Sequence, residues 1–163
     1  MLAAERVALR PLRAGDEEAL LRIHTQPEVR RWWGDPEDGF PWGDDPLQTR
    51  LAIELGGRLI GMVQFYEETT PRYRHASVDL FIDASHHGAG LGAETLGLVV
   101  AELAGRGHHR ITIDPALANA AAIRCYEKVG FERVGVMRCY ERDVDGQDWH
   151  DALLMELLLP AAG

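Results

Sequence analysis

The feature that most constrains the fold is a glycine-rich segment, HGAGLG at residues 87–92, between a strand pattern and a helix pattern. His75–Asp83 has the residue pattern of a strand, and a helix is expected from Ala93 to about Ala104, ended by Gly105 and Gly107. Glycines let a backbone approach a ligand closely, and a helix N-terminus presents N–H groups to an anion. The segment therefore predicts a strand–loop–helix unit whose natural ligand is a pyrophosphate.

Two common phosphate-binding motifs do not fit this loop. The dinucleotide-binding fingerprint is G-x-G-x-x-G, whereas Gly88, Gly90 and Gly92 have the spacing G-x-G-x-G. The acidic residue that this fingerprint expects about 20 residues later is also poorly matched. A loop of the G-x-x-x-x-G-K-[ST] kind is excluded because the segment contains no lysine. The loop by itself leaves a tight turn that only packs a helix as an open alternative.

The remaining pattern predicts an α/β chain with one mixed sheet and helices on its faces. Gly56-Gly57 and Asp145-Gly146 indicate hairpin turns, and Asp16 is expected to cap the first helix. Residues 27–46 hold so many glycines and prolines that loop and short helical turns are expected there. The other expected strands are Val7–Leu12, Arg50–Leu55, Arg58–Tyr66, Arg110–Asp114, Phe131–Glu141 and Trp149–Leu158, and a further helix runs from Asn119 to Lys128.

Composition limits the class of function. A chain of 163 residues, 46% hydrophobic and 26% charged, predicts a single folded domain over residues 1–163. No apolar run approaches the ~20 residues of a membrane span, and the N-terminus has no signal-peptide pattern, so no membrane partner is expected. A net charge of −9 argues against nucleic acid as a partner. It suits an amine-bearing small molecule, or is simply a solvated acidic surface.

Cysteine and histidine usage indicates the compartment and the absence of a metal. Cys125 and Cys139 are too few for a disulfide framework, and they lack metal-ligand partners at suitable spacing. The histidines likewise show no ligand spacing. We therefore expect a cytoplasmic protein without a bound metal.

A second motif follows the strand ITIDP: residues 119–131 read NAAAIRCYEKVGF, which is N-x-x-A-x-x-x-Y-x-x-x-G-F. Together with residues 82–92, this pattern resembles the GNAT superfamily of acyl-CoA-dependent N-acyltransferases. The resemblance implies the GNAT fold, a central mixed, mostly antiparallel twisted sheet flanked by helices, with splayed strands that form the acyl-CoA cleft. It also implies acetyl-CoA as the co-substrate, without a metal. The superfamily usually has Arg or Gln where His87 stands, which removes a permanent charge but leaves the backbone N–H groups that bind phosphate.

Within the superfamily, residues 111–135 and the segment PEVRRWWGD at residues 27–35 resemble aminoglycoside 6′-N-acetyltransferases. This implies acetyl transfer to a primary amine of a small cationic substrate, most of all an aminoglycoside-like aminosugar, by direct attack in a ternary complex. A similar tryptophan pair occurs among siderophore-type lysine acyltransferases. The alternatives are therefore a protein N-terminus, a lysine or a siderophore amine as acceptor, or a non-catalytic acyl-CoA sensor. A monomer or a homodimer is expected.

The resemblance also implies catalytic roles for three residues. An ammonium must lose a proton before it attacks a thioester, and Asp114, at the end of its strand, is the preferred base. Asp79 is assigned mainly to holding the cationic substrate, and Tyr126 is the general acid for the departing CoA thiolate. The structural alternatives are that Asp114 stabilises a turn before a proline, Asp79 lies on a solvated strand face, and Tyr126 packs in the core.

The implied binding residues fall into two groups. The main chain of Leu80, Phe81 and Ile82 would pair with pantetheine like an added strand, and an amide near Asp83 would polarise the thioester carbonyl. The rest of the cofactor site would be His87, Gly88, Ala89, Gly90, Leu91, Gly92, Ala93, Asn119 and Tyr126. The substrate site would be Trp32, Trp33, Asp35, Glu67, Asp79 and Asp114, with Trp42 and the acids of residues 37–45 nearby. Indoles stack on sugars and cations, whereas the alternative is an acidic surface loop pinned by tryptophans.

Overall fold

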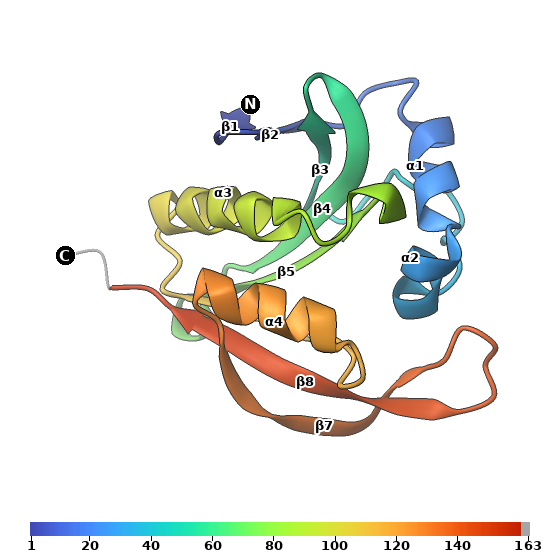
Figure 1. Cartoon of the computed structure of the whole chain (residues 1–163). Coiled ribbons are helices and arrows are strands. Elements are labelled where there is room, and N and C mark those ends of the chain that lie inside the picture. The colour runs from blue at the N-terminus through green and yellow to red at the C-terminus, as the bar shows by residue number, and fades with distance from the viewer. Residues whose placement is uncertain (161–163) are drawn as a thin grey trace.

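A computed structural model describes residues 1–160 of the chain, which form an eight-stranded sheet in the order β1-β2-β3-β4-β5-β6-β8-β7 (Figure 1). Every neighbouring pair is antiparallel except β5 and β6, which are parallel. The sheet is therefore mixed and mostly antiparallel, as the sequence predicts. The strands are β1 (Leu2–Ala3), β2 (Val7–Pro11), β3 (Gln48–Leu55), β4 (Arg58–Glu68), β5 (His75–Ile82), β6 (Arg110–Ile113), β7 (Glu132–Arg142) and β8 (Trp149–Leu158).

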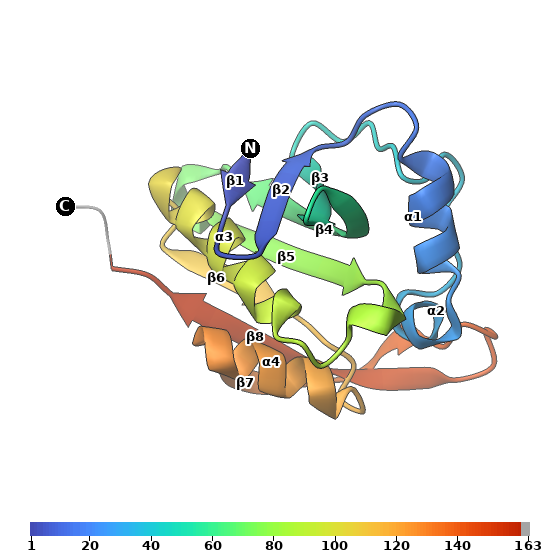
Figure 2. The same ribbon diagram turned by 45° about the horizontal axis from the view of Figure 1, so that its top comes forward.

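Within residues 1–160, four α-helices are present, and they flank the sheet (Figures 1 and 2). They are α1 (Glu17–His24), α2 (Pro27–Trp33), α3 (Leu91–Gly105) and α4 (Ala120–Val129), and two short 3₁₀ turns, η1 (Pro71–Tyr73) and η2 (Ala84–His86), bracket β5. The short helix α2 falls within the segment where loop and short helical turns are expected. None of the helices among residues 1–160 combines the length and the apolarity needed to cross a bilayer.

The alternation along β5 divides the core into two clusters on opposite faces of the sheet. Leu80 and Ile82 belong to the cluster that also contains Leu96 of α3 and Ile123 of α4. Phe81, which points to the other face, packs with Leu20 and Ile23 of α1, Val29 of α2, and Phe40 and Met62. Because successive side chains of a strand point to opposite faces, one strand anchors both helical layers. Asp79 shares the face of Phe81, so its carboxylate lies on the α1–α2 side.

The parallel strands β5 and β6 separate after two paired positions. Ala76 pairs with Ile111 and Ser77 with Thr112, whereas β5 continues to Ile82 without a strand partner on that side. The last five residues of β5 therefore expose one edge of the sheet at its centre (Figure 2). These are the splayed strands that the resemblance to the GNAT superfamily implies.

The start of α4 agrees with the sequence, whereas α3 begins two residues early and α1 lacks its expected side-chain cap. Gly90, at φ +78°, precedes α3, which begins at Leu91 rather than at Ala93. Asn119 caps α4, where its Oδ1 accepts a 3.2 Å hydrogen bond from the amide of Ala122. The expected side-chain cap at Asp16 is wrong: α1 starts after it, but the carboxylate instead binds Arg10, at 2.7 and 2.9 Å, and the backbone of residue 13. The buried guanidinium is a stronger partner than a helix amide.

Candidate active site

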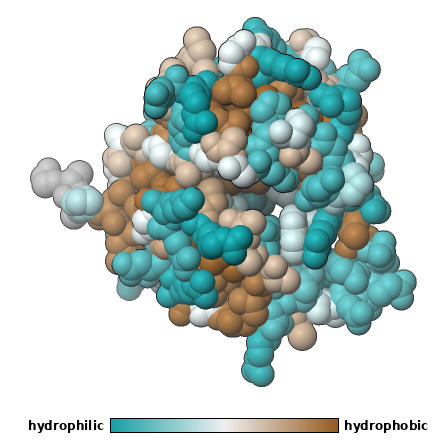
Figure 3. Space-filling model, viewed as in Figure 1, coloured by the Kyte–Doolittle hydropathy of each residue, from teal (hydrophilic) through white to brown (hydrophobic). Residues whose placement is uncertain are grey.

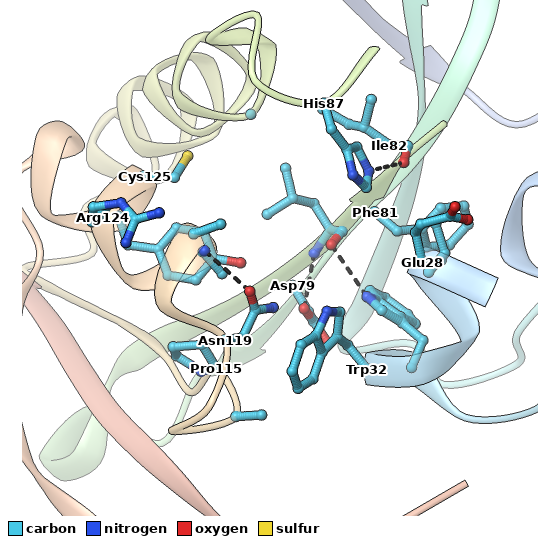
Figure 4. Close-up of a pocket in the computed structure, with 18 of the residues that line it drawn as sticks. Glu28, Trp32, Asp79, Phe81, Ile82, His87, Pro115, Asn119, Arg124 and Cys125 are labelled. Carbon is cyan, nitrogen blue, oxygen red and sulfur yellow. Dashed lines mark hydrogen bonds between the residues drawn. The ribbon is translucent and has the colours of Figure 1, made fainter. Parts of the chain in front are cut away.

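A cleft of about 750 Å³ opens where β5 and β6 separate. Its walls come from α2, β5, the start of α3, α4, the residues that follow β6, and β7. Figure 4 shows lining residues of α2, β5 and α4 around it. The surface is hollowed between α3 and α4 on one side and α2 on the other (Figure 3). The cleft therefore joins the glycine loop to the residues predicted to act on an amine.

The glycine loop lines the cleft at the N-terminus of α3, through His87, Gly88 and the four residues from Gly90 to Ala93. Gly88 and Gly90 have φ values of +76° and +78°, a backbone region that side chains with a Cβ rarely adopt. A Cβ on Gly92 would lie 3.3 Å from Sγ of Cys125, so this glycine lets the loop approach α4 closely. The loop and the α4 motif, separated in sequence, form one wall.

An ion pair that the sequence pattern did not reveal holds this loop. Arg6 donates from Nη1 to the carbonyl of Ala89 at 3.0 Å and from Nε to Glu94 at 2.9 Å. Glu94 also accepts the backbone amides of Arg6 and Val7, at 2.6 and 2.9 Å. Neither Arg6 nor Ala89 lines the cleft, so Arg6 supports the loop from behind. Ala89 was expected in the cofactor site, but its carbonyl instead accepts the hydrogen bond from Arg6 that supports the loop.

At the exposed edge of β5, three main-chain groups form hydrogen bonds with side chains. The amide of Leu80 donates to Oδ1 of Asp79 at 3.0 Å, and its carbonyl accepts from Nε1 of Trp33 at 3.2 Å. The carbonyl of Ile82 accepts from Nε2 of His87 at 2.7 Å, which places the proton on that nitrogen. Three site side chains therefore converge on the strand edge where pantetheine was expected (Figure 4).

The expected main-chain pairing of Phe81 with pantetheine is wrong, and the amide of Asp83 itself is engaged within the sheet. The amide of Asp83 donates to the carbonyl of Ile60 at 2.7 Å, so this part of β5 faces β4. Because main-chain direction alternates along a strand, Phe81 also faces β4, whereas Leu80 and Ile82 face the cleft. Neither Phe81 nor Asp83 can therefore pair with a ligand on the open edge, although Phe81 still lines the cleft.

Two carboxylates from adjacent strands meet in the cleft. Asp79 lies on β5 and Asp114 follows the last residue of β6, and both line the cavity. The Asp79 carboxylate is reachable from the cleft, but protein encloses it on its other sides. This burial, together with the negative charge of Asp114, raises the pKa of Asp79 to about 8. At neutral pH, Asp79 therefore carries a proton more often than not.

Asp114 has a partner that sequence reasoning missed. The hydroxyl of Tyr140 donates to Oδ2 of Asp114 at 2.8 Å, and this bond raises the pKa of Tyr140 to about 12. Tyr140 reaches the cleft because β7 is irregular between Met137 and Glu141, where Cys139 has φ +50°. Such a bulge turns a side chain away from regular alternation. The sequence gives no sign of this bulge, because residue 139 is a cysteine and not a glycine.

Tyr126 and Asn119 both line the cleft from α4 or its start. Tyr126 is only 8% exposed and packs against Phe131, with ring centroids 6.3 Å apart. Burial, with the nearby charge of Asp79, raises the pKa of Tyr126 well above its usual range, so the hydroxyl stays protonated. Oδ1 of Asn119 is engaged in the helix cap, which leaves its amide nitrogen as the group that could bind a ligand.

The acceptor side of the cleft is built by α2 and β7. Trp32 and Trp33 line it together with Glu28 and Arg31 of α2 and Glu141 of β7. Trp33 is fixed by its bond to Leu80 and by packing on Phe81, at 4.9 Å between ring centroids. Arg31 stacks over Trp32 at 4.4 Å. Glu28 and Glu141 are acids that sequence reasoning did not single out, because only the fold brings them to Asp79.

The chain matches the acetyltransferase (GNAT) family over residues 8–131. It belongs to that family. The aminoglycoside N(6′)-acetyltransferase type 1 of Klebsiella pneumoniae is 32% identical over an alignment of 154 residues that covers 80% of this chain and 76% of that protein. The predicted acetyl-CoA-dependent N-acetyltransferase is therefore confirmed.

Solved structures agree with the fold of this GNAT acetyltransferase. The aminoglycoside acetyltransferase AAC(6′)-Ib in complex with coenzyme A and kanamycin has a TM-score of 0.74 at 27% identity, with 93% of this chain and 94% of that chain covered. The spermidine N-acetyltransferase of Vibrio cholerae, in complex with CoA and spermine, has a TM-score of 0.80 at 20% identity, over 97% and 98% of the two chains. The predicted GNAT fold is confirmed.

Two residues predicted for the acceptor site lie elsewhere in this GNAT protein. Asp35 is 64% exposed at its side chain, pairs with Arg30 at 2.6 Å and does not line the cleft. Glu67 binds His108 and Arg106, both at 2.9 Å. It lies at the end of β4 opposite the cleft, because antiparallel β4 places that end beside the start of β5.

The wider tryptophan-and-acid platform is also not assembled. Nε1 of Trp42 donates to Glu17 at 3.1 Å, and Glu37 binds Arg50. Trp42 borders a separate, smaller cavity of about 230 Å³. Among residues 1–160, no cluster of three or more His, Cys, Asp or Glu side chains could hold a metal ion.

Proposed function

We propose that this GNAT acetyltransferase acetylates a primary amine of a small substrate with several ammonium groups, with aminoglycoside-like aminosugars as the first candidates. The observation that carries this proposal is a set of four carboxylates lining one cleft from four elements: Glu28, Asp79, Asp114 and Glu141. Carboxylates attract and orient ammonium groups, and the neighbouring indoles of Trp32 and Trp33 offer faces for a sugar or a cation.

The donor half of the cleft fits acetyl-CoA, which supplies the activated thioester. The backbone of Gly88 and Gly90 and the first turn of α3 would hold the pyrophosphate. Leu80 and Ile82 would present main-chain groups to the pantetheine arm in the manner of an added strand. The side-chain amide of Asn119 would bind the same arm from α4. A thioester laid along β5 in this way ends beside Asp79 and Asp114.

The acids have different roles in the proposed reaction. Because the pKa of Asp79 is about 8, this residue acts mainly as a hydrogen-bond donor or, once ionised, as a holder of the ammonium group. Asp114 takes the proton from the attacking amine, directly or through water, and Tyr140 orients its carboxylate. The amine nitrogen then bonds to the thioester carbonyl carbon, the carbon–sulfur bond breaks, and Tyr126 protonates the leaving thiolate. The products are an amide and free CoA.

The relatives support the choice of substrate class. The Klebsiella pneumoniae relative is named as an aminoglycoside N(6′)-acetyltransferase, and AAC(6′)-Ib was crystallised with kanamycin. The Vibrio cholerae protein was crystallised with spermine, which is also a polyamine. All of these ligands carry several amines on one flexible or sugar scaffold. They share the chemistry that four carboxylates around one cleft would recognise.

The test compares an aminoglycoside that bears a 6′-amine with the same scaffold bearing a 6′-hydroxyl, with release of free CoA thiol as the readout. We expect acetylation of the first compound only. KM for the aminoglycoside should rise with salt, since a Debye length of ~8 Å at physiological ionic strength screens such attraction. Above pH 8, where Asp79 is ionised, the rise should be smaller in Asp79→Asn than in the wild type. Acetylation of a peptide N-terminus instead would favour a protein acceptor.

The proposal extends to the setting of the enzyme. Cys125 and Cys139 are both free thiols, which suits a reducing, cytoplasmic compartment. The net charge of −9 favours an amine-bearing small molecule over nucleic acid. A monomer or a homodimer remains the proposed assembly, which light scattering at working concentration measures directly.

A further inference from the structure

The charges that line the cleft are divided between its elements. The four carboxylates belong to α2, β5, β7 and the end of β6, whereas two cations, Arg124 and Lys128, belong to α4. Arg31, the other arginine in the lining, is stacked on Trp32 of its own helix. The α4 side is therefore the one part of the lining whose charged side chains are all positive.

Arg124 and Lys128 are one helical turn apart and share the face of α4 that borders the glycine loop. Ala121, Cys125 and Lys128 follow the spacing of a single helix face, and all three line the cleft with Arg124. Cys125, between the two cations, is the residue that a Cβ on Gly92 would meet at 3.3 Å. The cations are thus placed directly beside the expected pyrophosphate loop.

Neither cation has an acidic partner. Within residues 1–160, nine of the 16 arginines form ion pairs, whereas neither Arg124 nor Lys128 lies within ion-pair distance of a carboxylate there. Lys128 is also the only lysine of a chain with net charge −9. Two adjacent unpaired cations on a cleft wall, in so acidic a protein, are suited to a ligand with its own negative charge.

We propose that Arg124 and Lys128 bind the 3′-phosphate of the CoA adenosine and make the enzyme prefer donors that carry it. This inference rests on the proposed use of CoA in the cleft. If pantetheine runs along β5 from the glycine loop toward Asp79 and Asp114, the nucleotide leaves the loop in the opposite direction and lies over α4. The loop itself, from His87 to Gly92, contributes no permanent positive charge. A phosphate monoester is close to a dianion at neutral pH, so two cations neutralise it.

The experiment measures binding by calorimetry, with CoA and 3′-dephospho-CoA as probes and adenosine 3′,5′-bisphosphate and 5′-ADP as shorter competitors. We expect the wild type to bind CoA about tenfold or more tightly than 3′-dephospho-CoA, because hydrogen bonds between a phosphate and cationic side chains are stronger than neutral ones. Arg124→Gln or Lys128→Gln should each lower this preference about threefold, and the double variant should nearly abolish it. Affinity for 3′-dephospho-CoA should change little in any variant.

Arg72→Gln is the matched control, because Arg72 is exposed on η1 and does not line the cleft. It should keep the full preference, and thermal unfolding should show all variants folded. Equal binding of CoA and 3′-dephospho-CoA by the wild type, or an undiminished preference in the double variant, would overturn this inference and leave the proposed acetyl transfer intact. Failure of CoA itself to bind the wild type would overturn both.

Discussion

The hydroxyl of Tyr140 on β7 donates a 2.8 Å hydrogen bond to Oδ2 of Asp114, which follows β6 and lies 26 residues earlier in the chain. The strand β8 separates β7 from β6 in the sheet, so a regular β7 would not bring this side chain to the end of β6. The irregular stretch around Cys139 makes the contact, and the amide of Cys139 is fixed by Oδ1 of Asp151 at 2.9 Å. The bulge therefore supports the candidate base.

Replacing Tyr140 with Phe should lower kcat about three- to thirtyfold, because Asp114 loses the group that orients it. The melting temperature should change little, since Tyr140 is 49% exposed. Steady-state kinetics in the Asp114→Asn background provide the control. If the two residues act together, Tyr140→Phe has almost no further effect there, whereas fully multiplicative losses would show that they act independently.

Asp79 should make the stability of the enzyme depend on pH. Its pKa rises from an ordinary 3.8 to about 8 in the folded protein, so the folded state holds a proton that the unfolded state releases. The cost to stability is absent below pH 4, grows as the pH rises and is complete above pH 8. Asp79→Asn removes this cost, so its melting temperature should exceed that of the wild type by a margin that grows between pH 4 and 8. A margin independent of pH would contradict the prediction.

Tyr126→Phe should lower kcat by roughly ten- to a thousandfold while the affinity for CoA stays close to that of the wild type. The ring keeps its packing against Phe131, and only the proton for the thiolate is lost. Single-turnover rates, with calorimetric affinity for CoA, separate the two effects. A variant as fast as the wild type when chemistry limits the rate would return Tyr126 to a role in core packing.

Arg6→Ala should weaken CoA binding about three- to tenfold, because the loop carbonyl of Ala89 and the carboxylate of Glu94 lose their shared partner. The kcat at saturating acetyl-CoA should remain near that of the wild type, since Arg6 does not line the cleft. Arg6→Lys should recover part of the affinity. A fall in kcat with unchanged CoA affinity would show that Arg6 does not act through the loop.

Gly61→Ala should destabilise the fold by about 1–3 kcal/mol, as overpacking of a core does. A Cβ at this position of β4 would clash with the carbonyl oxygen of Phe81, a backbone atom that cannot turn aside. Gly97→Ala is the matched control: no atom lies within 4 Å of its Cβ position on α3, and alanine there should stabilise the helix by ~1 kcal/mol. Denaturant unfolding of both variants compares them directly.

The sequence by itself determined the features that depend on neighbours along the chain. The alternation of β5, the glycine loop before α3 and the Asn119 cap of α4 follow from local backbone preferences, and each is present at or within two residues of its expected position. The family followed from the same two segments. Local patterning also indicated α2 and its tryptophans, because helices and turns are specified within a few residues.

Only the tertiary structure decided which of the acids share a site. Glu67 and Asp35 are acidic and near cleft elements in sequence, yet antiparallel pairing places the first at the far end of β5 and Arg30 holds the second. Glu141 and Tyr140 reach Asp114 through a bulge, and Arg6 reaches the glycine loop across more than 80 residues. Register, bulges and long-range ion pairs depend on how strands that are distant in sequence pack together. The periodicity of a single segment does not determine that packing.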